Sequence, residues 1–390
     1  MIYFVVTEAG SFSIRGYLAD QARSLADRMR VVLYGELAQM RQLPLGTWVF
    51  TEHDQLDEPH RDLATLVRDR LGAEGTSVRL MNDPRRVRMR LDLLRAAHRA
   101  GTNDHRAWRA TGVHLDARAR PNACDEHSIS AESLRYPVFV RYADKHAGNL
   151  TPLLDSPRSL ADAVAWLVAG GASRHALAVV EFCDTQDNQG VYRKYAAYNV
   201  AGTIVPRSLE CSRDWMVKWR ARIFDREHAD EELRYCEANP HEAWIGEMFR
   251  LARIDYGRID YSVQAGVPRL WEINTNPTIG RSPHNVLSDA AHVVAYRAMV
   301  ASARAVFHER FQKAWLAVDT PAGEGASVEL QMPATLTRAI DRAAKQRRNE
   351  KRVGSLVNIV ARQAWLKPVT HAVKRALAPI MAARLRDGSP

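Results

Sequence analysis

The chain has 390 residues, of which 46% are hydrophobic and 26% charged, with 55 Lys and Arg, 45 Asp and Glu, and four Cys. This composition is that of a globular protein of two or three domains, and it excludes a disordered chain, a collagen and a disulfide scaffold. Residues 331–390 hold 13 basic and 3 acidic residues, so residues 1–330 hold 42 of each sign. Attraction to polyanions is therefore a property of the C-terminal segment.

The cysteines and the N-terminus indicate the compartment. The four cysteines lie far apart and form no C-x-x-C pair, which argues against a zinc site or a redox motif and fits reduced thiols. The N-terminus MIYFVVTEAG lacks a basic region and reaches Glu8 too early for a signal peptide, and no stretch approaches about 18 apolar residues. We expect a cytoplasmic protein, peripheral at the membrane if its basic tail binds there.

Strands alternate with helices at the start of the chain, which predicts an α/β domain over residues 1–112. Asp83 is the expected N-cap, and Pro84 the first residue, of a helix that continues to Ala100 and stops at Gly101. The expected strands are 2–6, 31–34, 47–51 and 77–81, and the other helices are 17–29 and 58–71.

From Tyr136 onward the pattern indicates antiparallel strands with helices, which predicts an α+β domain over residues 113–285. A turn at Ala201-Gly202 joins two of its strands, and Gly170-Gly171 ends its capped helix. We expect a small subdomain at 113–182 and a large one at 183–285. Strands are expected at 137–141, 176–182, 192–200 and 203–207, a helix at 156–169, a helical extension at 286–318 and a linker at 319–332.

The segment GRIDYSVQAGVPRLWEINTNPTIG, residues 257–280, is the most informative. Two alternating runs flank Ala265-Gly266-Val267, which predicts a hairpin with a three-residue loop. In that register Asp260 lies opposite Glu272, and Asn274 points to the same face.

Opposed side chains have Cβ atoms about 4.5–5.5 Å apart, and two carboxylates that close repel unless a cation lies between them. A set of oxygen ligands with open positions suits Mg²⁺ shared with phosphate oxygens. The alternative is that Asp260 and Glu272 are solvated residues on an edge hairpin. The polar turn Asn274-Thr275-Asn276-Pro277 favours the metal site, because it is an odd choice merely to end a strand.

The order of PVFVR, VVEF, RK, RIDY and WEINTNP resembles the ATP-grasp superfamily, which includes D-alanine:D-alanine, glutathione and glutamate-adding ligases. The likeness covers roughly residues 75 to 285. It implies an α/β domain followed by an ATP-grasp domain, in which two subdomains sandwich ATP. It also implies that Asp260, Glu272 and Asn274 hold magnesium against the ATP phosphates.

The resemblance implies further nucleotide contacts. Adenine would meet Glu181 and Phe182, and the ribose Asp184, or else Asp187; Phe182 is otherwise a core residue. The phosphates would meet Arg141 and Arg88 or Arg90, where the family usually has Lys, although Arg can still hold phosphate oxygens in pairs. The loop 143–149 offers one glycine where relatives have several, so Lys145, His146 and Gly148 would compensate, unless the loop is only a turn.

Basic residues on the following strands resemble those that stabilise an acyl-phosphate and its oxyanion. They are Arg193, Lys194, Arg207 and, further along, Lys218. For each one alone, a surface salt bridge is the alternative. Segments 100–135 and 220–245 are expected to form walls of an acceptor pocket, with His241 or Trp244 as contacts.

The implied activity is an ATP-dependent ligase with ATP and Mg²⁺ as cofactors. A small-molecule or peptide carboxylate attacks the γ-phosphate, and an amine then displaces phosphate to form an amide. No Ser or Cys nucleophile motif is present, so the substrate carries the intermediate. The alternatives are an ATP-grasp kinase acting on a hydroxyl and a non-catalytic nucleotide-binding assembly protein.

The segment 333–390 is basic and has two apolar stripes at helical spacing, one from Val353 to Ala364 and one from Val369 to Met381. It predicts an amphipathic helical tail. Its partner is the protein's own body, a second subunit in a homo-oligomer, an anionic membrane surface or tRNA.

Overall fold

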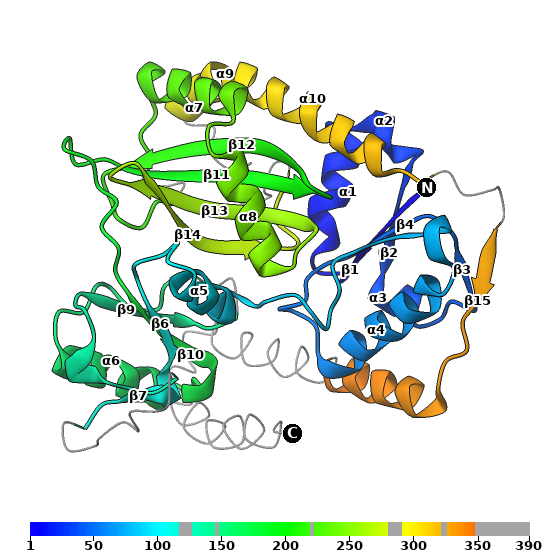
Figure 1. Ribbon diagram of the computed structural model, residues 1–390, viewed down its shortest axis with the longest axis horizontal. Coiled ribbons are helices and arrows are strands. Elements are labelled where there is room, and N and C mark those ends of the chain that lie inside the picture. Colours follow the sequence, from blue (N-terminus) through cyan, green and yellow to red (C-terminus); the bar gives the residue numbers. More distant parts are fainter. Residues whose placement is uncertain (117–126, 145–147, 219–221, 280–290, 321–325, 348–390) are drawn as a thin grey trace, which may run out of the picture. The chain divides into compact units, whose positions relative to one another are not determined.

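The computed structural model describes residues 1–116, 127–144, 148–218, 222–279, 291–320 and 326–347 (Figure 1). The chain forms two compact units. The first comprises Met1–Asp104 and Cys183–Pro333, and the second comprises His105–Phe182 and Ala334–Pro390. The mixture of strands and helices agrees with the expected α/β and α+β content.

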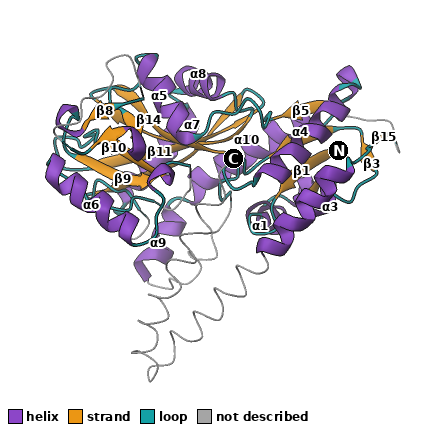
Figure 2. Ribbon diagram, turned by 90° about the horizontal axis from the view of Figure 1, so that it is seen from below, coloured by secondary structure: helices purple, strands orange, loops and turns teal. Residues whose placement is uncertain are grey.

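The first unit begins with a four-stranded parallel sheet in the order β2-β1-β4-β5. Parallel pairing requires crossover connections, and helices supply them. Helix α4 has a buried face made of Leu63, Ala64, Val67 and Leu71, and it lies against this sheet (Figure 2). The strands are β1 (Ile2–Val6), β2 (Met29–Leu33), β4 (Thr47–Phe50) and β5 (Arg79–Met81), and the helices are α1 (Ser11–Asp20), α2 (Arg23–Ala26), α3 (Tyr34–Leu37), α4 (Glu58–Gly72) and α5 (Arg90–Arg99).

The same unit contains a four-stranded antiparallel sheet in the order β12-β11-β13-β14. Its strands are β11 (Tyr192–Val200), β12 (Thr203–Ser212), β13 (Tyr256–Gln264) and β14 (Val267–Asn274). Helices α7 (Arg226–Ala238) and α8 (Glu242–Ala252) share a buried cluster with one face of it, which includes Tyr235, Phe249, Ile259 and Tyr261 (Figure 1). The opposite face carries the polar Lys194, Arg258 and Asp260 towards one end, and the buried Tyr198 and Tyr256 towards the other.

Helix α10 (Ala301–Val318), which follows α9 (Ala291–Met299), joins the two sheets. Its Phe307, Phe311 and Trp315 lie in one cluster with Phe4 of β1 and Tyr198 of β11. This shared core explains why residues far apart in sequence form one unit.

The second unit contains a three-stranded antiparallel sheet in the order β6-β10-β9. Helix α6 (Pro157–Ala169) packs on it through Leu160, Val164 and Leu167. The strands are β6 (Ala107–Arg109), β9 (Val138–Tyr142) and β10 (Leu177–Glu181), with a small pair formed by β7 (Val113–His114) and β8 (Ile129–Ser130). Residues 334–347 are helical.

Two local sequence signals are confirmed. Helix α6 begins after Ser156, whose side chain accepts from the Ser159 amide, and it ends at Gly170. The turn between β11 and β12 is Ala201-Gly202, and both residues have positive φ, 48° and 98°.

Other expectations were wrong. Asp83 caps no helix, because its carboxylate binds the Arg85 amide and the Arg68 and Arg85 guanidiniums, and α5 starts only at Arg90. The expected helix 17–29 is instead α1, which starts six residues earlier, followed by the short α2 and the start of β2.

Two further segments contain elements that the sequence did not predict. Within the linker 319–332, β15 (Ser327–Glu329) pairs with β3 (Gln42–Pro44). Segment 220–245 contains α7 and the start of α8, and its expected part in an acceptor pocket stays a prediction. The two apolar stripes of the tail lie outside the described residues, so its partners and the domain boundaries stay predictions. None of the described helices is long and apolar enough to cross a membrane.

Removing the side chain of Asn82 is expected to destabilise the first unit by about 3 kcal/mol or more. Asn82 is fully buried at φ 61°, and its amide makes four hydrogen bonds to the main chains of Phe50, Asp255 and Tyr256. Each buried group left unpaired costs about 1–3 kcal/mol. Urea denaturation of Asn82→Ala measures the loss. Asn82→Gly separates the backbone strain, because glycine adopts positive φ freely, and wild-type stability in both variants would contradict this assignment.

The buried His53 and the half-buried His308 are expected to make stability fall in acid. Burial lowers the pKa of His53 to about 4, and burial with Arg207 and Arg304 does the same for His308. An unfolded histidine titrates near pH 6.5, so stability is complete above that pH and is lost as the pH falls towards 4.

We therefore expect His308→Phe to lose less thermal stability than the wild type between pH 7 and 4.5. The imidazole stacks on Tyr17 with ring centres 5.6 Å apart, and a phenyl ring can replace it there. His175→Phe, at an exposed position, is the control and should follow the wild type. Equal pH dependence of all three proteins would contradict the assignment.

Candidate functional site

The β13–β14 hairpin places Asp260 opposite Glu272, as expected, although by a different route. The turn has two residues, Ala265 and Gly266, with φ 47° and 80°, rather than three. That turn pairs Tyr261 with Leu270 and would set the acids out of register. A bulge at Trp271 adds one residue to β14 and restores the opposition.

Each of the two opposed carboxylates is paired with an arginine. Arg258 lies two residues before Asp260 on the same strand face, and its Nε and Nη2 donate to the two carboxylate oxygens at 2.7 and 3.1 Å. Arg90, buried at the start of α5, approaches Glu272 Oε2 at 2.6 Å. The arginines therefore relieve the repulsion between the acids without any other cation.

Lys194 and Glu210 extend this polar face across β11 and β12. Lys194 Nζ lies 2.8 Å from Glu210 Oε2, and Arg222 approaches the other oxygen at 3.7 Å. Burial acts against the ionised carboxylate, but Lys194 and Arg222 lower the pKa of Glu210 to about 2. Burial also opposes a charged Lys194, yet Glu210 and Asp260 raise its pKa. Lys194 and Glu210 are thus both ionised at neutral pH.

Asn274 ends β14 on the same face as Glu272, since it pairs with Arg258. Its Oδ1 accepts from the Asn276 amide at 2.8 Å, which fixes the start of the N-T-N-P turn. Asp260, Glu272 and Asn274 offer only hard oxygen atoms, and a carboxylate oxygen can accept from an arginine and still bind a cation. The donor set therefore fits Mg²⁺.

Glu52 is a feature of this region that sequence analysis missed. It follows β4 with φ 58°, it is buried, and its carboxylate accepts from the Thr7 amide at 2.6 Å. Its own amide donates to Thr275 Oγ1, so the turn after β14 docks on the carboxyl end of the parallel sheet. A Cβ on Gly10 would lie 1.9 Å from Glu52 Oε1, so a larger residue there would have to displace the Glu52 carboxylate. Ligands of open α/β sheets bind at the carboxyl ends of the strands. The position of Glu52 directly after an expected strand was therefore the signal that could have identified it from the sequence.

The four predicted catalytic residues do not gather at one place. Lys194 points to the same face of the sheet as Asp260. Arg193, its neighbour on β11, points to the opposite face. There it binds Asp187 and lies 2.8 Å from Glu231 of α7. Arg207 is the extra residue of a bulge in β12, and its guanidinium lies 4.7 Å from the centre of the Phe307 ring. Lys218 is exposed in the loop after β12. Their catalytic roles stay predictions.

The predicted nucleotide contacts are divided between the two units. Arg88, Arg90 and Asp184 lie in the first unit, and Arg88 Nη1 donates to the Leu251 carbonyl at 2.8 Å. Arg141, Gly148, Glu181 and Phe182 lie in the second, and Gly148 has φ 77°. Lys145 and His146 lie outside the described residues.

Glu181 has strong partners of its own. Its carboxylate accepts from the Arg106 guanidinium at 2.6 Å and from the Arg135 amide at 2.9 Å, and it is almost fully buried. These contacts join β10 to the segments before β6 and β9. An adenine contact of this side chain, and of Phe182, stays a prediction.

Arg258 is the residue that sequence reasoning should have found. The pattern R-I-D puts two side chains of opposite charge two positions apart, on one face of a strand. His241 Nδ1 lies 2.9 Å from Tyr261 Oη, and Trp244 packs on the Tyr261 ring. Their expected contact with an acceptor substrate stays a prediction. Tyr261 has the opposite parity to Asp260, so both lie on the helix-covered face.

Comparison with known proteins gives similarity only in structure, because no family model and no curated protein matches the sequence. Similar solved structures include D-alanine–D-alanine ligase from Bacillus anthracis complexed with ATP, with 12% identity, 80% of this chain and 99% of that chain covered, and a TM-score of 0.41.

Two others are the ATP-grasp ligase PsnB complexed with minimal precursor, Mg and ADP, and the D-cycloserine synthetase DcsG. PsnB shares 14% identity over 77% of this chain and 97% of its own, with a TM-score of 0.43. DcsG shares 16% sequence identity over 80% of this chain and 99% of its own, with a TM-score of 0.40.

Proposed function

We propose that the protein is an ATP-dependent ligase that joins a carboxylate to an amine, with ADP and phosphate as the other products. The observation that carries this proposal is the opposed pair Asp260 and Glu272, with Asn274 beside it and Arg258, Arg90 and Lys194 around it. Two acids alone would be solvated surface residues. Acids held in a fixed array of buried and half-buried cations would form a site for a metal with phosphate oxygens.

Asp260, Glu272 and Asn274 would hold Mg²⁺, which neutralises the charge on the transferring phosphoryl group. Arg258 and Arg90 bind the carboxylates and present further guanidinium donors, which suits them to orient phosphate oxygens. Lys194, held by Glu210, keeps a positive charge at the same face. The chain's role is to position the reactants and to neutralise charge.

In the proposed reaction an oxygen of the substrate carboxylate attacks the γ-phosphorus, and the bond from that phosphorus to the β–γ bridging oxygen breaks, so ADP leaves. The nitrogen of the amine then attacks the acyl carbon, phosphate departs with the bonding pair, and the amine loses a proton. Both steps conserve atoms and charge without any oxidant or reductant.

The cysteines in the described residues support an intermediate carried by the substrate. Burial raises the pKa of the Cys211 and Cys236 thiols to about 12, and Cys183 is also buried. A nucleophilic cysteine needs a lowered pKa and access to the substrate. Cys211 and Cys236 have neither, and burial denies Cys183 access.

Magnesium should strengthen ATP binding to the wild type and not to Glu272→Gln. The substitution removes the charge of one proposed ligand while keeping its shape. Isothermal titration calorimetry with a non-hydrolysable ATP analogue, with and without Mg²⁺, measures the difference. We expect at least a tenfold gain with Mg²⁺ in the wild type, or about 1.4 kcal/mol, and less than a threefold gain in the variant.

Glu247→Gln is the matched control, since Glu247 is an exposed glutamate on α8. Its Mg²⁺ dependence should equal that of the wild type. Thermal unfolding of the three proteins checks that all are folded. If Glu272→Gln is folded and keeps the full gain, the assignment of the metal ligands is wrong.

Incubation with ATP, Mg²⁺ and a metabolite extract should yield a new amide, detected by mass, with stoichiometric ADP and phosphate. Once the acid is identified, its carboxylate can be labelled with ¹⁸O, and one labelled oxygen should appear in the released phosphate. A stable phosphorylated product without free phosphate would instead identify a kinase. Asp260→Asn should reduce product formation at least 100-fold.

A further inference from the structure

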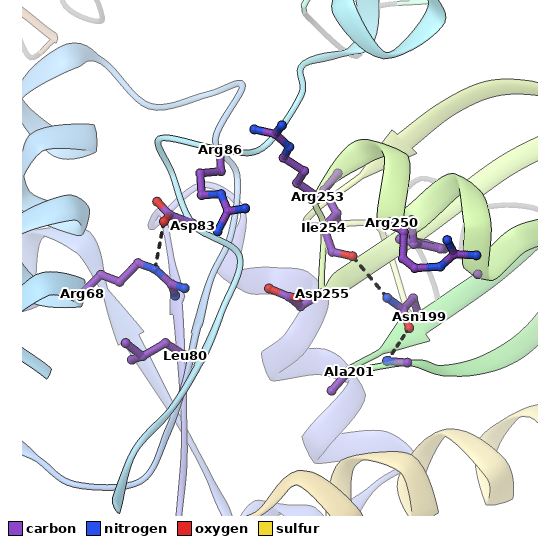
Figure 3. Close-up of a pocket in the computed structure, with 13 residues that line it drawn as sticks. Arg68, Leu80, Asp83, Arg86, Asn199, Ala201, Arg250, Arg253, Ile254 and Asp255 are labelled. Atoms are coloured by element: carbon purple, nitrogen blue, oxygen red, sulfur yellow. Dashed lines mark hydrogen bonds and ion pairs between the residues drawn. The ribbon is translucent and has the colours of Figure 1, made fainter. Parts of the chain in front are cut away.

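A polar hollow of about 620 Å³ lies in the first unit (Figure 3). Arg68 of α4, with Asp83 and Arg86 after β5, forms one wall, and the end of α8 with Asp255 forms the other. The β11–β12 turn contributes Ala201 and Gly202. A volume of this size suits a small metabolite.

Four arginines line this hollow: Arg68, Arg86, Arg250 and Arg253. Only two acids line it, and both are engaged in the fold. Asp83 binds Arg68 at 3.4 Å and also Arg85, and Asp255 Oδ2 accepts from the Asn82 amide at 2.7 Å. The hollow therefore carries an excess of two positive charges.

The arginines keep donors that the protein does not use. Within the described ranges, the guanidiniums of Arg86, Arg250 and Arg253 have no hydrogen bond or ion pair. Arg68 Nη1 is buried and also lacks a hydrogen-bond partner there. In Figure 3 the arginines come from both walls. Arg86, Arg250 and Arg253 are exposed, so among the four the cost of a buried donor without a partner applies to Arg68 Nη1. An oxyanion would supply the acceptor for it and would bind the other guanidiniums in place of water.

This hollow is distinct from the proposed nucleotide site. Asn199 lines the hollow. On β11 it points to the same face as Tyr195 and Ala197, which is the face covered by α8. Asp260 and Arg258 have the opposite parity, since they pair with Ala196 and Tyr198. A ligand in the hollow would therefore lie behind the sheet from the metal ligands.

We propose that this hollow is a binding site for a small dianion, a phosphate monoester or a dicarboxylate. The oxygens of the dianion would accept hydrogen bonds from guanidiniums of both walls. The bound dianion would thereby connect α4 and the turn after β5 to α8 and β13. Asn82 already joins these segments through its hydrogen bonds to Asp255 and Tyr256. Since β13 also carries Asp260, occupancy would stabilise the strand on which the metal site is built.

The test is thermal unfolding and calorimetry of the full chain with methyl phosphate or succinate, at constant ionic strength and without ATP or Mg²⁺. At about 100 times the dissociation constant, binding should raise the melting temperature by about 3 °C or more. The double variant R86A/R253A should bind at least tenfold more weakly than the wild type. The compound that raises the melting temperature more, methyl phosphate or succinate, represents the class of dianion that the site prefers.

Two controls distinguish this site from others. R226A/R234A removes two exposed arginines of α7 and should bind as the wild type does. Arg141→Ala tests the proposed phosphate grip and should also leave binding unchanged. If R86A/R253A binds both dianions normally, or if only Arg141→Ala abolishes binding, the proposal is wrong. Either outcome leaves the ligase proposal standing, because these experiments contain neither ATP nor Mg²⁺.

Discussion

The pairing of two carboxylates with two guanidiniums across one hairpin is the constraint on which the site depends. Asp260 and Glu272 face each other across β13 and β14, and Arg258 and Arg90 hold them there. Each acid of this array has a guanidinium partner, so removal of one partner would leave a charge uncompensated. Under the proposed function, the array would receive a metal and a nucleotide without any new charge on the protein.

The hairpin shows how far the sequence could be interpreted. Alternation of apolar and polar residues predicted both strands, and symmetry about Gly266 predicted that Asp260 opposes Glu272. The opposition is correct, but it arises from a two-residue turn and a bulge at Trp271, which compensate one another. Alternation reports which residues share a face, and it does not reveal an inserted residue. The cap of α6 and the turn at Ala201-Gly202 were predictable because their signals are local.

Other features depend on partners that only the fold supplies. Arg193 appeared beside Lys194 in sequence, yet neighbours on a strand point to opposite faces, and Arg193 binds α7. Glu181 is held by Arg106, and Asp83 by Arg68 and Arg85, through contacts that no sequence pattern shows. Helix α7 was missed because its sequence, REHADEELRYCEA, is so polar that its apolar stripe is short. Such elements are fixed by tertiary contacts rather than by local propensity.

The most direct test of the central claim is a crystal structure with Mn²⁺ and a non-hydrolysable ATP analogue. Anomalous scattering locates the metal independently of the protein density. The account predicts a metal ion about 2.0–2.3 Å from oxygens of Asp260, Glu272 and Asn274 and from the nucleotide phosphates. A metal bound only by phosphates, or a nucleotide located away from this hairpin, would contradict it.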